Sequence, residues 1–186
     1  MSPSAEETRC LQSARASEHR LATAFVEIAR RHAEDAGISD MMLQLAAWSE
    51  GHVQALDEIL GALGSLEITV HGRSETLHRA LFRGAGSGPA RLLHDVEDLS
   101  LLATRVRGLW TVLGQAAHAR RDKEASARAA RFGDQLDRQI AWLETQVKTI
   151  AAQALTVPPP VKRPRRLVPR KKSAPVLARV PTDAGR

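Results

Sequence analysis

Two residues in the first part of the chain have the right types and spacing to act together chemically. Glu18 and His52 each fall on a row of apolar residues that recur at steps of three and four. A carboxylate that faces an imidazole can form a buried hydrogen bond, or it can help to hold a divalent metal ion if another ligand is present. Asp95 and Asp137, in later segments of similar periodicity, are the candidates for that other ligand. A third interpretation places Glu18 and His52 near solvent, if the rows are counted one residue out of phase.

Helices are the elements that would position these residues. The apolar period is three to four residues through most of residues 1–156, and strand-type alternation is rare. Gly37 is expected to end the first helix, Asp40 to cap the start of the second, and Pro89 to stand in the first turn of the third. The pattern predicts four helices, at residues 5–35, 40–63, 89–118 and 122–155.

The pattern weakens between residues 65 and 88, where glycines flank one short amphipathic piece around Ser74 to Phe82. We interpret this stretch as a crossover connection, because a bundle of four long helices often contains one long link. The expected fold class is therefore all-α, an antiparallel four-helix bundle with one long crossover. This bundle is expected to occupy residues 1–156 as a single domain.

This layout resembles the ferritin-like superfamily. A more specific resemblance is to small bacterial ferritin-like domains of unknown function that are associated with stress. It rests on Leu77-His78-Arg79-Ala80, on residues 84–88, and on the acidic run His94-Asp95-Val96-Glu97-Asp98. The resemblance covers about residues 10–155 and implies the bundle fold.

Iron-binding members of that superfamily place an inward Glu on the first and third helices and Glu-x-x-His on the second and fourth. Glu18 and His52 match this pattern, but Ser49 stands where the Glu of the second helix would be. The third helix has an apolar seam with Asp95 beside it, and the fourth helix has no histidine. We therefore expect a non-catalytic bundle without a cofactor. The alternative is a metal-handling or oxidation-defence protein with a degenerate iron or other divalent metal site at Glu18, His52, Asp95 and Asp137.

Composition narrows the setting of the protein. Cys10 is the only cysteine, so no intramolecular disulfide can form, and a reducing cytoplasm is expected. No apolar run approaches the roughly 20 residues of a membrane span. The opening residues Met1 to Glu7 show no basic patch followed by an apolar stretch, so we expect no signal peptide.

The net charge of +6 is unevenly distributed along the chain. Residues 157–186 hold nine Lys or Arg and one acidic residue, a net charge of +8, whereas residues 1–156 hold 18 basic and 20 acidic residues, a net charge of −2. The same final segment holds seven of the nine prolines. Because proline at this density is incompatible with a helix or a sheet interior, a disordered basic tail is predicted.

A flexible polycation binds phosphate backbones, and this one has no aromatic residue that could stack on bases. We therefore expect binding to nucleic acid without sequence preference, with added avidity if the bundle forms a homo-oligomer. An adaptor or cargo protein that docks to a protein partner through residues 174–180 is an alternative, and a tail that only aids solubility is another. The lack of an amphipathic helix or lipidation signal in the tail argues against a membrane partner. The predicted nucleic-acid contacts are Lys162, Arg163, Arg165, Arg166, Arg170, Lys171 and Lys172.

Overall fold

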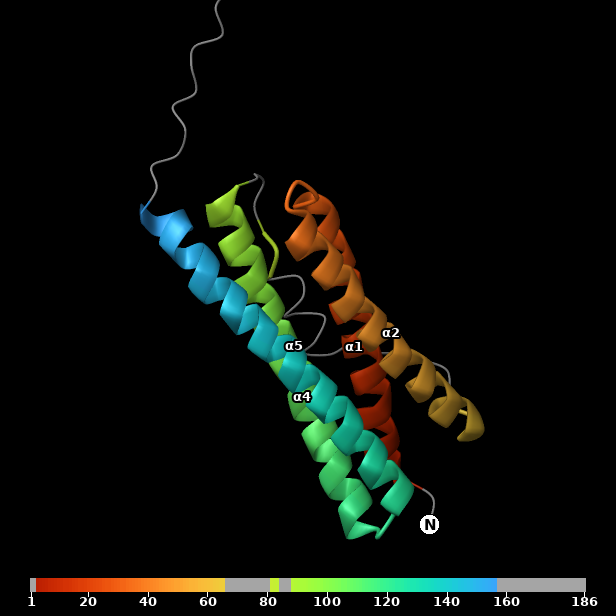
Figure 1. Cartoon of the computed structure of the whole chain (residues 1–186). Helices are drawn as coiled ribbons and strands as arrows, with labels where there is room; N and C mark the ends of the chain where they lie inside the picture. Colours follow the sequence, from red (N-terminus) through yellow and green to blue (C-terminus); the bar gives the residue numbers. More distant parts are fainter. Residues whose placement is uncertain (1–2, 66–80, 84–87, 157–186) are drawn as a thin grey trace, which may run out of the picture.

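The structure is a computed structural model that describes residues 3–65, 81–83 and 88–156. The described residues form an all-helical bundle with no strand (Figure 1). Its helices are α1 (Ala5–Arg31), α2 (Ala36–Ala62), α4 (Pro89–Ala119) and α5 (Lys123–Thr156). The four helices predicted from periodicity are thus confirmed. The predicted disorder of residues 157–186 and most of the short piece predicted around Ser74 to Phe82 lie outside the described residues.

The turn between α1 and α2 differs from the prediction. Gly37 does not end α1, which stops at Arg31, and Asp40 is not the cap of α2. The cap is Asp35, whose side chain accepts a hydrogen bond from the backbone N–H of Ile38 at 3.3 Å. This bond satisfies one of the free N–H groups at the helix start, so α2 begins four residues earlier than predicted and Gly37 lies in its first turn.

Prolines and aspartates set the starts of the other two helices. Pro89 occupies the first turn of α4, as predicted, where its missing N–H costs nothing. Asp122 precedes α5, and its side chain accepts a hydrogen bond from the N–H of Ala125 at 3.0 Å. Only two residues besides Asp122 separate α4 from α5, so these helices form a tight antiparallel hairpin.

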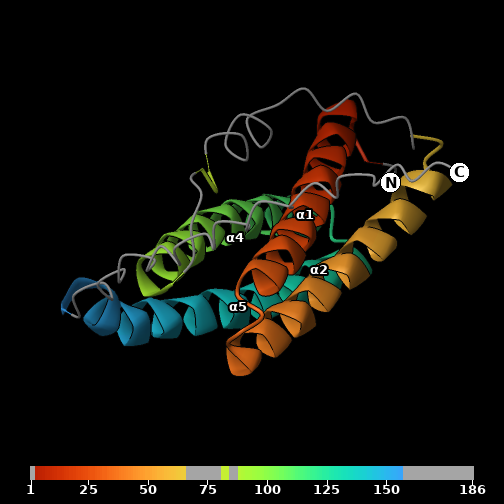
Figure 2. The ribbon, with the colours of Figure 1, turned by 90° about the horizontal axis from the view of Figure 1, so that it is seen from above.

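Each helix packs antiparallel to its neighbours. α1 lies between α2 and α4, while α5 packs mainly on α4 and touches α2 along a shorter stretch (Figures 1 and 2). Side-chain contacts show the antiparallel orientation, because residues near the start of one helix contact residues near the end of the next. Between α1 and α4 these contacts are Glu7 with Arg120, Glu18 with Trp110, and Arg31 with Asp95.

The core is built from the predicted apolar seams. Leu21, Phe25, Leu56, Leu99 and Leu136 are fully buried, and they come from all four helices. Apolar burial at about 25 cal/mol per Å² is the main term that holds such helices together. None of the described helices is long and apolar enough to cross a membrane.

Candidate functional site

Glu18 and His52 meet in the middle of the bundle. Nδ1 of His52 lies 2.8 Å from Oε1 of Glu18, and both side chains are buried. The prediction that these two residues approach each other across α1 and α2 is confirmed. The short α1–α2 turn explains why, since residues at similar distances from a tight turn face each other on antiparallel helices.

Two further side chains complete this polar centre. The indole Nε1–H of Trp110 donates to the same Oε1 of Glu18 at 2.7 Å, and Nε2 of His52 lies 2.7 Å from Oε1 of Gln135. All four helices therefore contribute one group to the centre. Oε2 of Glu18 is buried and has no hydrogen-bond partner in the described part of the protein.

Aromatic rings enclose the imidazole of His52. The ring of Phe132 lies 4.2 Å from it, centroid to centroid, and the ring of Trp110 meets it edge-on at 6.1 Å. Nδ1 of His52 therefore faces Glu18 and Nε2 faces Gln135, so both ring nitrogens have a hydrogen-bond partner. The pair of Glu18 and His52 is buried and shielded by aromatic rings.

The neighbouring inward positions carry an amide and a hydroxyl. Nε2 of Gln139 donates to the carbonyl oxygen of Leu45 at 3.0 Å and lies 3.3 Å from Oγ of Ser49. Both side chains are fully buried. The sequence prediction identified Ser49 as a substituted position but missed Gln135 and Gln139. Gln139 lies three residues after the buried Leu136 in α5, on the same row as the apolar residues. This spacing could have predicted that Gln139 faces the core.

Asp95 is the clearest correction to the sequence prediction. It was expected to flank the seam of the third helix, but its side chain is fully buried. Nη1 of Arg31 donates to Oδ1 at 2.7 Å, Nη2 of Arg91 donates to Oδ1 at 2.5 Å, and Nε2 of His32 lies 2.8 Å from Oδ2. The end of α1 packs over this part of α4, so Asp95 neutralises charges there and does not reach Glu18 or His52.

Asp137 is also held elsewhere. It lies on the surface, where Arg107 donates hydrogen bonds to its carboxylate from Nε at 2.8 Å and from Nη2 at 3.0 Å. The hydrogen bonds that Arg107 donates to Asp137 raise the pKa of the guanidinium. Gly133 makes room for this pair, because a Cβ at Gly133 would approach the guanidinium carbon to 3.2 Å.

The four predicted metal ligands are therefore not brought together. Glu18 and His52 form one centre, whereas Asp95 and Asp137 belong to two separate clusters. Within the described ranges, no three His, Cys, Asp or Glu side chains are grouped closely enough to hold a metal ion. The inward donor set of Glu18, His52, Ser49 and Gln139 does not fit a di-iron centre, which needs several carboxylates.

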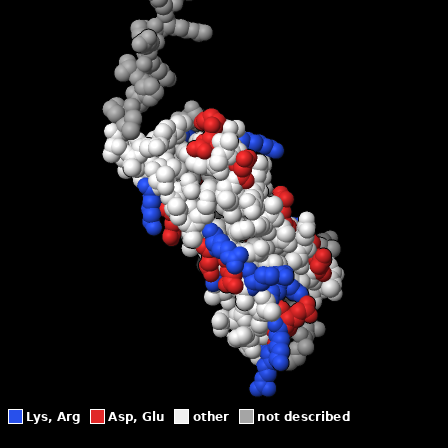
Figure 3. All heavy atoms as spheres, in the orientation of Figure 1, with Lys and Arg blue, Asp and Glu red and all other residues white. Residues whose placement is uncertain are grey.

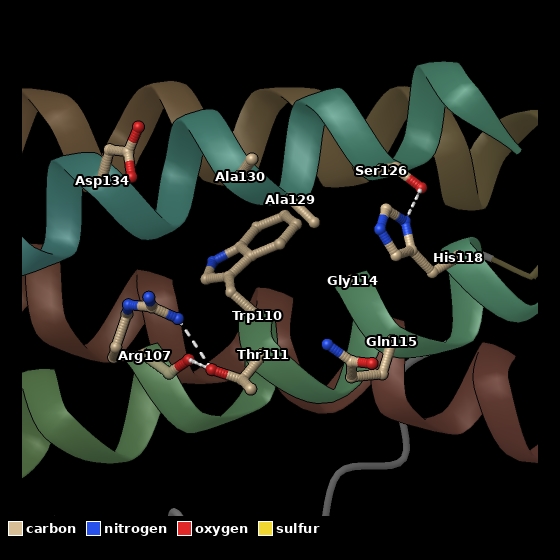
Figure 4. Close-up of a pocket in the computed structure, with 10 residues that line it drawn as sticks. All are labelled: Arg107, Trp110, Thr111, Gly114, Gln115, His118, Ser126, Ala129, Ala130 and Asp134. Carbon is tan, nitrogen blue, oxygen red and sulfur yellow. Dashed lines mark hydrogen bonds between the residues drawn. The ribbon is translucent and has the colours of Figure 1, made fainter.

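A cleft on the outer side of the α4–α5 hairpin leads towards this centre. It has a volume of about 320 Å³, and Trp110 lies at its floor between Asp134 and His118 (Figure 4). Nδ1 of His118 lies 3.1 Å from Oγ of Ser126 at one end of the cleft. Trp110 therefore separates the buried Glu18 from a polar surface cleft that the sequence did not predict.

No protein-family model matches the chain, and no curated protein matches it. The seven basic residues that were predicted to contact nucleic acid, Lys162 to Lys172, lie outside the described residues.

Proposed function

We propose that this protein is a non-catalytic helical bundle of ferritin-like plan, of the stress-associated kind, that binds nucleic acid without sequence preference through residues 157–186. The charge distribution is the observation that carries this proposal. A body of net charge −2 is followed by a segment of net charge +8 that contains seven prolines and no aromatic residue. Such a segment attracts phosphates but offers no surface that reads bases.

The packing order supports the ferritin-like part of the proposal. α2 ends beside the start of α1, where Gln12 donates to the carbonyl oxygen of Ser65, and α4 begins near the end of α1, where Arg31 meets Asp95. The chain therefore moves from one end of the bundle to the other between α2 and α4. A single long crossover of this kind is a property of ferritin-like bundles.

The chemistry of the inward positions supports a non-catalytic role. Trp110 and Gln135 bond to Glu18 and His52, and Gln139 and Ser49 contact each other at the neighbouring inward positions. Indole, amide and hydroxyl groups of this kind shield the pair more readily than they bind and activate a substrate. The centre thus resembles a structural polar network that fixes the helix register.

The test is binding of the intact protein and of a variant that lacks residues 157–186 to a labelled 30-base-pair duplex, measured by fluorescence anisotropy over a salt series. If five to eight phosphates are contacted, the slope of log K against log salt is about −4.5 to −7. The truncated protein should remain folded by circular dichroism and lose most of the affinity. Intact protein without salt-sensitive binding, or truncated protein that binds as before, would contradict the proposal.

Two other outcomes would assign another function. Protein purified without chelator that carries about two equivalents of iron, lost in Glu18→Ala and His52→Ala, would indicate metal handling. A peptide of residues 157–186 that captures one defined protein, with no binding of the intact chain to DNA, would indicate an adaptor or cargo protein.

A further inference from the structure

The body of the protein has one strongly basic region of its own. Residues 118–131, which run from the end of α4 through the turn into α5, hold five of the 18 Lys and Arg residues of the body and two acidic residues. This stretch has a net charge of +3, so the rest of residues 1–156 has a net charge of −5. We refer to residues 118–131 as the hairpin tip. Figure 3 shows Lys and Arg gathered over this end of the molecule.

Ion pairs neutralise only part of the positive charge of the hairpin tip. Arg120 pairs with Glu7 and Asp122, and Arg128 pairs with Glu124. Arg121 and Lys123 are exposed, and their side chains form no ion pair with any residue in the described part of the chain. The fifth cation, Arg131, is also exposed, and its guanidinium lies over the ring of Phe132 at 4.9 Å. Arg121 and Lys123 are therefore available for an external anion.

These two cations border a hollow that is lined with further polar groups. Arg121, Lys123, His118 and Ser126 enclose a volume of about 520 Å³. His118 uses Nδ1 for its contact with Ser126, so Nε2 is its second polar atom. Cationic, imidazole and hydroxyl groups around one hollow match the oxygens of a phosphate group, for which both charge and hydrogen-bond donors are needed.

The hairpin tip lies at the start of α5, and residues 157–186 follow the last residue of this helix, Thr156, in the sequence. α5 has 34 residues, so a rise of about 1.5 Å per residue places its two ends about 50 Å apart. This distance corresponds to about 15 base pairs of duplex at about 3.4 Å each. A duplex that lies along α5 would reach from the hairpin tip to the point at which the basic segment begins, and a second contact on the same ligand adds avidity.

We propose that the hairpin tip is a second contact surface for the phosphate backbone of nucleic acid, used together with residues 157–186. The inference rests on the proposed function and extends it from the tail to the folded body. Two phosphate contacts are too few to hold a duplex alone, so the hairpin tip strengthens binding that the tail begins. Each of its contacts contributes about 0.9 to the salt slope.

The test uses the full-length chain with Arg121→Asn and Lys123→Gln combined. Asn is chosen because Arg121 has a backbone φ of +59°, in the left-handed region that Asn tolerates. The matched control is Arg30→Gln with Arg83→Gln, which removes the same charge from two exposed positions outside the hairpin tip and outside α5. Arg121→Gly with Lys123→Gln is a second variant in case Asn perturbs the turn, and circular dichroism checks that each variant is folded.

The measurement is anisotropy with the 30-base-pair duplex over the same salt series. The hairpin-tip variant should lower the magnitude of the salt slope by about 1.8 and weaken binding about eightfold per lost contact near 0.1 M salt, more than the control does. Equal slopes and affinities for variant and control would overturn the inference. If truncation of residues 157–186 still abolishes binding in that case, the proposed function stands. If the intact protein does not bind the duplex, both the inference and the proposed function are overturned. If the hairpin-tip variant loses binding only to phosphatidylserine vesicles, the hairpin tip is instead a contact surface for a membrane.

Discussion

Oε1 of Glu18 lies 2.8 Å from Nδ1 of His52, and this contact joins α1 to α2 inside the core. Trp110 donates a second hydrogen bond to the same oxygen, so one carboxylate atom links three helices. Buried polar contacts of this kind favour one arrangement of helices over others that bury the same apolar area. We therefore expect this contact to favour the observed register of the helices and to contribute to stability.

Replacing Glu18 with Ala should lower the free energy of unfolding by about 3–5 kcal/mol, because it leaves His52 and Trp110 as buried donors without an acceptor. Glu18→Gln should cost less, since the amide oxygen can still accept from one donor. Urea denaturation followed by circular dichroism measures both changes. A loss below about 1 kcal/mol for Glu18→Ala would show that the contact contributes little.

Asp95 and Asp137 allow a buried and an exposed ion pair to be compared for their contribution to stability. Asp95→Ala should cost about 3–5 kcal/mol, because Arg31 and Arg91 would lose their shared buried carboxylate. Asp137→Ala should cost less than about 1 kcal/mol, because its pair with Arg107 is exposed to solvent. Chemical denaturation of the two variants compares them directly, and equal costs would contradict the assignment of Asp95 to the core.

Asp122 should make stability depend on pH in the acid range. The N–H of Ala125 and then the guanidinium of Arg120 lower the pKa of the Asp122 carboxyl below its ordinary value of 3.8. A lowered pKa means that the stabilising contribution is fully present above about 3.8 and is lost as the pH falls through the folded-state value.

Asp122→Asn isolates this effect, since Asn keeps the capping acceptor and removes the charge. The difference in unfolding free energy between wild type and this variant should shrink between pH 5 and about pH 2. Thermal melts at several pH values measure it. A difference that stays constant over this range would show that the charge of Asp122 does not contribute.

Cys10 should react slowly with thiol reagents at neutral pH. Burial raises the pKa of this thiol above 9.0, an effect larger than the opposing one from nearby Arg105. Little thiolate is then present at pH 7, and the thiolate is the reactive form. The rate of reaction with a disulfide reagent should be well below that of a free cysteine peptide and should rise after unfolding in urea. A native rate equal to that of the peptide would contradict this expectation.

Local sequence patterns were sufficient for the helices and for the Glu18–His52 contact. Apolar period and Pro89 act within one segment, and the short link between α1 and α2 leaves little freedom in how those two helices align. The exact start of α2 was predicted wrongly, because both Asp35 and Asp40 are suitable caps. Only the backbone geometry decides which side chain accepts the amide hydrogen bond.

Residue patterns along the chain are enough to predict an all-helical body, a seam that carries Glu18 and His52, and a division between a slightly acidic body and a basic final segment. Which polar residues meet between distant helices depends on the packing of the whole bundle. Asp95 contacts Arg31 and His32, more than 60 positions away along the chain, and no local pattern specifies the alignment of helices joined by so long a link. The hairpin tip likewise becomes a surface only when α4 and α5 fold back on each other, because that turn brings His118 and Ser126 together.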